Sequence, residues 1–363
     1  MIAEKNKVNL RQFDFSDIDK IIELLNHEYK TNFTRDWWKW KYELNPNGFK
    51  GEDGDIWVAE SEDKIVAHYA IVPEKLRFQS KTLNIAQAVD AITDPDYRGR
   101  GLFSTMMKKV FSQAKKRYRL VYGFPAEISY KGSLRYGWSD LSPLPLRVKI
   151  LDYDSYFRRN FGDTITVQGR KLFTRASSQV TRYSKNLFSR KTEEENVKIE
   201  RVDSFSDDIN AFWERASGNY GAILERTATF LNWRFSKHFG CYKILVGHTA
   251  KKGIVGYIVF KSDAKSVTII DLITLPNEDA AMSKLIDAAI SESLTPQVDC
   301  VQLCFPKWHS NEAILSRKGF NSPIRPILKK TYFPHFIYFH LTEEQPVPKT
   351  GEWFITYTDT DFM

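Results

Sequence analysis

Two arginines and two glycines alternate at residues 98–101, within the stretch DPDYRGRGLFSTMM (94–107), where an apolar run ends and an amphipathic segment begins. The first amides of a helix have no partner within the helix, and the helix dipole favours negative charge there. Glycines at 99 and 101 let an anion approach the main chain, and the arginines can add charge-assisted hydrogen bonds. The stretch therefore predicts a turn that binds phosphate or pyrophosphate, with a basic surface turn as the alternative.

The segments around this turn predict the elements that must position it. Apolar residues recur at helical spacing after the turn, which predicts a helix from Leu102. The neighbouring segments predict strands at 55–61, 64–72, 84–93 and 120–124, and helices at 16–29 and 129–136. This mixture and order are typical of an α+β domain built on a mixed sheet.

Five short sequence segments (words) recur in similar form and in the same order in the two halves of the chain. The acid of the third word lies 34 residues before the phenylalanine of the fourth in both halves, from Asp90 to Phe124 and from Asp271 to Phe305. The paired words are WWKWKY and FLNWRF, KIVAHYAIV and GIVGYIVF, AVDAITDP and IIDLITLP, VYGFP and QLCFP, and RYGW and RKGF. Such a repeat predicts two tandem domains of one kind. Their expected limits are 1–150 and 196–335, with a basic insert at 151–195 and a strand-like tail at 336–363.

With these flanks, the opening stretch resembles the acetyl-coenzyme A signature of the GNAT N-acetyltransferases, R/Q-x-x-G-x-G/A between a strand and a helix. Arg98 matches the first position and Gly101 the central glycine, whereas Phe103 departs from the last small position. The resemblance covers 1–150 well and 196–335 weakly. It implies a tandem GNAT architecture, acetyl-CoA as cosubstrate and no metal. The cofactor-binding residues that it implies are Ala91, Ile92, Thr93, Arg98, Gly99, Arg100, Gly101, Leu102, Phe103 and Ser104.

The second copy lacks the features of this turn. In register, Glu278 and Asp279 stand where Tyr97 and Arg98 stand in the first copy, and Ala280-Ala281-Met282 replaces the glycines. Two acids without a glycine are unsuited to a pyrophosphate. We therefore expect a degenerate second domain and a cofactor site in the first copy alone.

Acetyl transfer to an amine needs a positioned thioester, a neutral amine and a proton for the leaving thiolate. The resemblance implies direct attack in a ternary complex. It places a general base on the strand before the turn, where Asp90 is the first candidate. Glu127, just past GFP (123–125), is the second candidate. A structural carboxylate is the alternative for Asp90, since Asp271 recurs in the second copy. The usual tyrosine position of the closing helix holds Ser133, so the nearby Tyr130 is the candidate acid.

Three further side chains are candidates for binding the acceptor. The resemblance places Trp37 and Trp38 in the region that walls the acceptor pocket, with packing in the core as the alternative. His68 lies on a predicted strand beside that region, and a structural role is its alternative. Similar tandem proteins imply a small-molecule amine as the acceptor, with an amino sugar as the first choice.

Composition and charge narrow the classes of function. The chain has 363 residues, of which 42% are hydrophobic, so two folded domains are expected. Residues 156–191 hold nine basic residues and one acidic residue, which accounts for the whole net charge of +8. No broad basic face remains, so no nucleic-acid partner is expected. The insert reads as a solvated connector, with contact to RNA or an anionic membrane as the alternative.

The sequence shows neither a secretory signal nor an apolar run of about 18 residues, so no integral membrane segment is expected. Its odd number of cysteines, Cys241, Cys300 and Cys304, favours a reducing, cytoplasmic location over a disulfide framework. Cys300 and Cys304, on a predicted buried strand, favour packed thiols over a zinc site.

The sequence thus predicts an acetyl-CoA-dependent N-acyltransferase with its active site in the first copy. One alternative is a tRNA-dependent aminoacyl transferase of cell-wall synthesis, with which the basic insert is compatible. Another is a non-catalytic CoA-binding module, which Ser133 and Phe103 favour. Acyl-chain preference and oligomeric state are left open.

Overall fold

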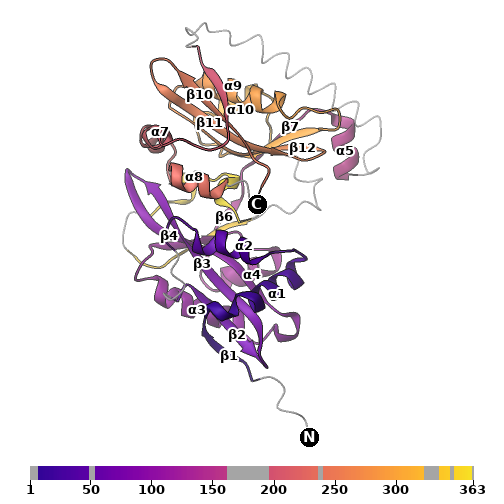
Figure 1. Cartoon of the computed structure of the whole chain (residues 1–363), viewed down its shortest axis with the longest axis vertical. Coiled ribbons are helices and arrows are strands. Elements are labelled where there is room, and N and C mark those ends of the chain that lie inside the picture. Colours follow the sequence, from indigo (N-terminus) through magenta and orange to yellow (C-terminus); the bar gives the residue numbers. More distant parts are fainter. Residues whose placement is uncertain are drawn as a thin grey trace. The chain divides into compact units, whose positions relative to one another are not determined.

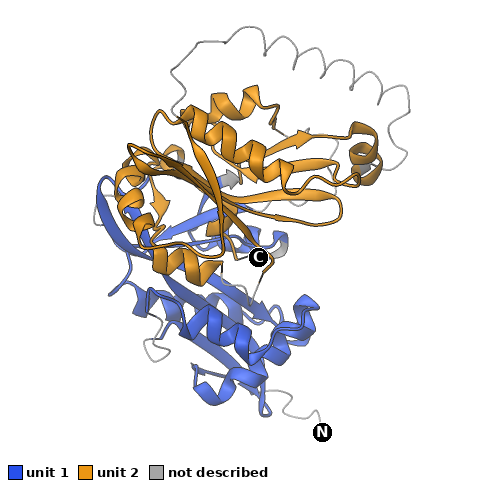
Figure 2. Cartoon of the chain, turned by 45° about the horizontal axis from the view of Figure 1, so that its top comes forward, with its two compact units in different colours: residues 1–143, 334–348 blue, residues 144–333, 349–363 orange. Residues whose placement is uncertain are grey.

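The computed structural model describes residues 7–48, 54–161, 196–235, 240–322, 335–343 and 347–361 (Figure 1). The chain forms two compact units: unit 1 comprises residues 1–143 and 334–348, and unit 2 comprises 144–333 and 349–363 (Figure 2). Each unit contains its own sheet with packed helices. The predicted α+β class is therefore confirmed.

The sheet of unit 1 has the strand order β1-β2-β3-β4-β5-β14-β6. Neighbouring strands are antiparallel except β4 and β5, which run parallel. The strands are β1 (Asn9–Gln12), β2 (Ile56–Ser61), β3 (Lys64–Phe78), β4 (Lys81–Thr93), β5 (Leu120–Gly123), β6 (Ser139–Pro143) and β14 (His335–His340). The expected hairpin and the strands on either side of the glycines are thus present.

Helices cover both faces of this sheet because each has one apolar side. The helices are α1 (Ile18–Tyr29), α2 (Arg35–Trp38), which continues as a π-helical turn (Lys39–Glu43), α3 (Leu102–Ala114) and α4 (Glu127–Arg135). Ile21 and Leu25 of α1 and Trp38 of α2 are buried in one core cluster, and Met106 and Val110 of α3 in another. Helix α3 begins at Leu102, as predicted.

Unit 2 repeats the plan of unit 1. Its sheet has the order β7-β13-β12-β11-β10-β8, and β12 and β13 run parallel as β4 and β5 do. The strands are β7 (Leu146–Ile150), β8 (Lys198–Val202), β10 (Lys243–Thr249), β11 (Gly253–Ser262), β12 (Ser266–Thr274) and β13 (Cys300–Cys304). Its helices are α5 (Tyr153–Phe161), α7 (Asp208–Ala216), α8 (Ala228–Arg234), α9 (Asp279–Ser291) and α10 (Glu312–Arg317). The repeated words therefore fall on corresponding elements.

Two strands, β14 and β7, lie in the sheet that the other half of the chain mainly forms. Strand β14 follows the second half in sequence, yet it lies between β5 and β6 in the sheet of unit 1. Conversely, β7 follows β6 in sequence but pairs with β13 in unit 2, where Val148 also bridges Asn321. Each sheet is completed by a strand from the other half.

This exchange corrects the expected domain limits. Residues 144–150 belong to unit 2 rather than to the first domain, and residues 334–348 return to unit 1 rather than forming a separate tail. The sequence reading assigned each strand to the nearest half because local patterns contain no information on which sheet edge a strand joins. Of the basic insert, α5 is described, and residues 162–195 lie outside the described part.

The exchanged strand gives a test of the fold. Ile337 of β14 is 2% exposed within the core of unit 1, opposite Gly123 of β5. Ile337→Asp places an unpaired charge there, so we expect a loss of several kcal/mol of unfolding free energy. Hydrogen exchange should show the β5 amides losing protection, although the substituted residue is remote in sequence. His340→Gln, at the exposed end of β14, is the control. If the β5 amides of Ile337→Asp kept the protection of the wild type, the assignment of β14 to the sheet of unit 1 would be contradicted.

Candidate functional site

The glycine turn, residues 98–101, joins the 3-10 turn Pro95–Tyr97 to α3. Gly99 and Gly101 have φ angles of 77° and 76°, in the left-handed region that glycine adopts without strain. A Cβ atom at Gly99 would meet no atom within 4 Å, and one at Gly101 would meet only Ser104 Oγ, at 3.9 Å. The main chain of the turn is therefore accessible to a ligand.

The amides that follow the turn have no acceptor within the described residues. The N–H groups of Gly99 to Ser104 make no hydrogen bond to the described protein, and the first amide of the series with a partner is that of Thr105, which donates to Gly101 O at 3.0 Å. The amide of Arg98 donates to Pro95 O at 3.3 Å, so the main-chain N–H of Arg98 is already paired within the protein. Several unpaired N–H groups at a helix start form a binding site for an anion.

The two arginines of the turn are already held by protein groups. Arg98 donates from Nε to Thr93 O at 3.0 Å and from Nη2 to Glu28 Oε2 at 2.7 Å. Arg100 donates from Nη2 to Asp96 O at 3.1 Å, and its guanidinium lies 4.7 Å from the centre of the Tyr97 ring. These contacts brace the turn. The role of Glu28 was not predicted, because nothing in its local pattern distinguishes it from other exposed helix acids.

Strands β4 and β5 separate just before the glycine turn. They pair only where Ala86 to Ala88 face Val121 to Gly123. Beyond Ala88, β4 continues to Thr93 with β3 along its other edge, so Ala91, Ile92 and Thr93 lie on the part of β4 that has left β5. The unpaired edge can accept an extended ligand by β-type hydrogen bonding.

A buried cluster surrounds Asp90 at this point of β4. Lys41 Nζ donates to both carboxylate oxygens at 2.8 Å, and Tyr42 Oη donates to Oδ2 at 2.5 Å. His68 Nδ1 lies 2.8 Å from Asp90 O. Both carboxylate oxygens thus accept hydrogen bonds from the protein, which favours the structural interpretation of Asp90. Lys41 and Tyr42 were not predicted as site residues, although a lysine within the aromatic word WWKWKY is a usable signal.

The other acceptor-site candidates divide between core and surface. Trp38 is fully buried, with its ring between Phe13 and Tyr42, so its assignment to the acceptor pocket is wrong. His68 is also fully buried and cannot contact an acceptor in this conformation. Burial lowers the pKa of His68, so its ring is neutral near pH 7. Trp37 is half-buried and stacks on Phe33, with the two ring centroids 3.9 Å apart. It therefore stays a candidate for lining the acceptor pocket.

Helix α4 places the remaining catalytic candidates. Tyr130 donates from Oη to Asp140 Oδ2 at 2.6 Å, and its ring stacks on His335 of the exchanged strand at 3.6 Å. The bond to the Asp140 carboxylate raises the pKa of Tyr130 to about 12, so the phenol keeps its proton at neutral pH. Glu127 lies exposed in the first turn of α4. Ser133 is 3% exposed and donates to Ser129 O, as a helix hydroxyl commonly does.

The corresponding turn of unit 2 is shorter. Residues 275–278 connect β12 to α9 and contain no glycine, whereas residues 94–101 connect β4 to α3. Ala280-Ala281-Met282 lies within α9 rather than in a turn, so the residue-by-residue register was wrong here. The connection after α9 is longer than the connection after α3. The spacing from Asp271 to Phe305 therefore still equals that from Asp90 to Phe124. Glu278, 8% exposed, accepts from Lys252 Nζ at 2.8 Å.

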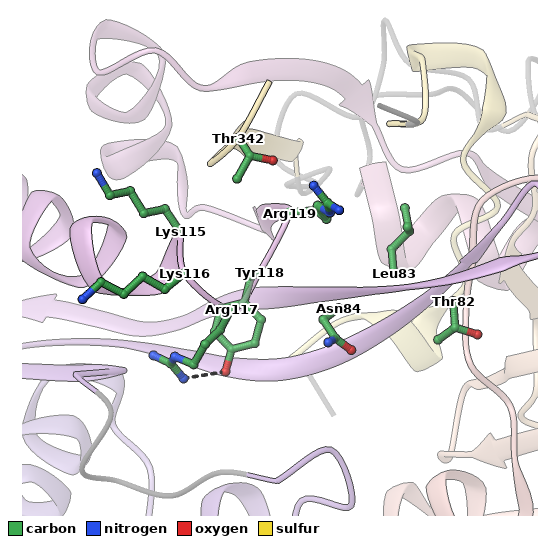
Figure 3. A pocket seen from close by; sticks show the side chains of 9 residues that line it. All are labelled: Thr82, Leu83, Asn84, Lys115, Lys116, Arg117, Tyr118, Arg119 and Thr342. Atoms are coloured by element: carbon green, nitrogen blue, oxygen red, sulfur yellow. Dashed lines mark hydrogen bonds between the residues drawn. The ribbon is translucent and has the colours of Figure 1, made fainter. Parts of the chain in front are cut away.

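A separate groove lies at the opposite end of the same strands (Figure 3). It has a volume of about 370 Å³ and is lined by Thr82, Leu83, Asn84, Lys115, Lys116, Arg117, Tyr118, Arg119 and Thr342. Arg117 is ion-paired with Asp55 at 2.7 Å. The basic residues here follow the C-terminus of α3, where positive charge complements the helix dipole. The groove is therefore distinct from the glycine turn and has a structural explanation for its charge.

Within the described ranges, no three His, Cys, Asp or Glu side chains are grouped so as to hold a metal ion. None of the described helices is long and apolar enough to cross a membrane. All three cysteines are free, and burial raises the pKa of Cys300 and of Cys304 to about 12, as expected for packed thiols.

Solved structures share this fold at low sequence identity. A probable N-acyltransferase of unknown function from Enterococcus faecalis is 12% identical with a TM-score of 0.64, covering 93% of this chain and 73% of that chain. A GCN5-related N-acetyltransferase from Anabaena variabilis is 14% identical, with a TM-score of 0.62 and coverages of 93% and 73%. N-myristoyltransferase from Saccharomyces cerevisiae, solved with bound myristoyl-CoA, is 13% identical, with a TM-score of 0.55 and coverages of 92% and 79%.

No curated protein matches the sequence. Residues 9–140, however, match the family model described as an acetyltransferase (GNAT) domain. The matched region contains the glycine turn and both of the strands that separate before it. The match therefore identifies an acetyltransferase (GNAT) domain in residues 9–140, the part of the chain that builds the site.

Proposed function

We propose that the protein transfers an acetyl group from acetyl-CoA to a primary amine, with the active site in unit 1. The amides of Gly99 to Ser104, which have no acceptor within the described protein, are the observation that carries this proposal, because such amides at a helix start favour the binding of an anion. The coenzyme diphosphate is the anion that we assign to them. The separation of β4 from β5 leaves an edge beside the turn where the pantetheine arm can pair with Ala91, Ile92 and Thr93.

We propose that the pantetheine arm, bound along this edge, directs the acyl group toward α4. In the proposed ternary complex, the amine nitrogen attacks the thioester carbonyl, the N–C bond forms and the C–S bond breaks. The amine proton passes to a base, and the thiolate takes a proton from an acid. Glu127 is the more accessible candidate for the base, since the carboxylate of Asp90 is already engaged. Tyr130 is the candidate acid, and Asp140 holds its hydroxyl in the structure.

The acceptor that we propose is a small amine, such as an amino sugar. Trp37, which is half-buried, is the aromatic side chain left to line the acceptor pocket once Trp38 is assigned to the core. We propose that unit 2 does not bind the cofactor, because residues 275–278 lack both the glycines and the length of the turn. The cytoplasmic location and the absence of a nucleic-acid partner stay predictions.

Binding of acetyl-CoA tests the glycine turn. We expect acetyl-CoA to raise the melting temperature, with about 2.7 kcal/mol of stabilisation at 100 times the Kd. Gly101→Val should abolish the shift, because valine disfavours positive φ and its side chain obstructs the amides. Arg98→Glu should also abolish it by adding negative charge. Gly48→Val is the matched control, because Gly48 has a φ of 85° and open surroundings away from the turn. An equal shift in Gly101→Val and wild type would contradict the proposed site.

Release of free thiol tests the transfer reaction. Amino sugars, aminoglycosides and other small amines, each added with acetyl-CoA, should include an acceptor that releases one thiol per acetylated amine. Binding of acetyl-CoA without thiol release by any amine class would support the non-catalytic module instead. Stabilisation by charged tRNA and none by acetyl-CoA would support the aminoacyl transferase.

Tyr130 gives a separate test of the acid. Tyr130→Phe should lower kcat at least 100-fold and leave the Kd of acetyl-CoA unchanged, since a general acid contributes to the chemical step alone. Tyr136→Phe is the control, because Tyr136 is exposed at the end of the same helix. Retention of kcat in Tyr130→Phe would exclude Tyr130 as the acid.

A further inference from the structure

We propose that Lys41, Tyr42 and His68 form a clamp that holds a strained bulge at Asp90 and thereby keeps the edge of β4 open for the acyl-CoA arm. Asp90 is then a positioning residue rather than the general base. The proposal rests on the proposed function, because it assigns the open edge to that ligand.

Asp90 is the strained residue of β4. Its φ is 49°, a left-handed value that a residue with a Cβ atom adopts at a cost in free energy. The other described non-glycine residues with positive φ lie at turns or at a helix end; they are Lys30, Glu62, Asp63, Gln79, Ser80 and Asn277. Asp90 alone among them lies inside a strand, so the surrounding structure must enforce its conformation.

The clamp supplies that enforcement from outside β4. Lys41 and Tyr42, from the π-helical turn, bind the carboxylate of Asp90, and His68, from β3, binds its carbonyl oxygen. A carbonyl oxygen can only accept, so His68 Nδ1 carries the proton in this contact. All four residues are at most 9% exposed. Side chain and main chain of one residue are thus fixed from two directions in a region that excludes water.

The bulge determines how β4 runs beyond its contact with β5. On β3, His68 pairs with Ile92 and Ala70 with Val89, so Asp90 and Ala91 together face Tyr69. Without the extra residue, every side chain from Ala91 to Thr93 would exchange faces of the sheet. The carbonyl of Thr93, which Arg98 binds, would turn with them. The open edge and the glycine turn therefore both depend on the conformation of Asp90.

Unit 2 shows that a buried acid at this position does not by itself produce the strain. Asp271 accepts hydrogen bonds from Arg226, Tyr257 and Thr356, and it is fully buried. Its φ is not among the positive values, and the irregularity of β12 falls beside it, at Ile270. The left-handed acid thus occurs in the unit that has the glycine turn, and an acid of ordinary conformation occurs in the unit that lacks it.

Asp90→Asn separates positioning from catalysis. The amide oxygen of asparagine can still accept from Lys41 and Tyr42, and asparagine tolerates positive φ. A positioning role predicts a change of less than about fivefold in kcat and in the Kd of acetyl-CoA. If Asp90 were the general base, kcat of Asp90→Asn would fall 100-fold or more, because a general base contributes at least about that factor to the rate. That loss, at an unchanged Kd, would overturn the proposal.

Lys41→Met tests the clamp itself. Isothermal titration should show the Kd of acetyl-CoA raised at least tenfold, and steady-state kinetics should show a raised KM for acetyl-CoA with kcat changed much less. Lys39→Met, an exposed residue in the same π-helical turn, is the matched control and should match wild type. Tyr42→Phe removes one hydroxyl and serves as a milder variant, with a rise of about threefold, if Lys41→Met does not fold by circular dichroism.

The double variant Lys41→Met with Asp90→Gly distinguishes strain from general damage. Glycine adopts the left-handed conformation freely, so it should keep the bulge without the clamp and restore the Kd to within about threefold of wild type. If wild type binds acetyl-CoA and Lys41→Met binds equally well, or if Asp90→Gly restores nothing, the clamp proposal is overturned while the proposed function stands. If wild type itself does not bind acetyl-CoA, the proposed function fails and the clamp's role fails with it.

Discussion

Unpaired main-chain amides at the start of α3 are the constraint on which the rest of the site depends. From Gly99 to Ser104 no described protein atom accepts their hydrogen bonds, and the local helix dipole adds positive potential. Protein groups fill the positions around them: Arg98 is braced by Glu28 and Thr93 O, and the carbonyl of Gly101 accepts from Thr105. The turn therefore presents several main-chain donors that an anion can accept from.

The strand exchange links the site to the distant end of the chain. Strand β14 lies between β5 and β6, and its His335 stacks on Tyr130 of α4. The candidate acid thus packs against a strand that follows the whole of the second half in sequence. The sheet of unit 1 is thus completed by a strand that follows unit 2 along most of its sequence.

Local patterns predicted much of this structure. The start of α3 at Leu102, the glycines of the turn and the strands on either side of them follow from periodicity, turn chemistry and the family signature. The partners of Asp90 and Arg98 could not be predicted from local patterns, because Lys41 and Glu28 approach from helices far away in sequence. Trp38 was misassigned since an aromatic residue beside a cleft and one in the core have the same local pattern. Strand exchange escaped prediction because it concerns which sheet edge a strand joins.

Amide chemical shifts on titration with 3′-phosphoadenosine diphosphate, which carries the coenzyme diphosphate without the acyl arm, test the central claim most directly. We expect the N–H resonances of Gly99 to Ser104 to shift together and saturably, since the diphosphate accepts hydrogen bonds from them. The amides of Lys115 to Arg119, beside the basic groove, should stay in place. Shifts confined to that groove, with the amides after the glycine turn unmoved, would contradict it.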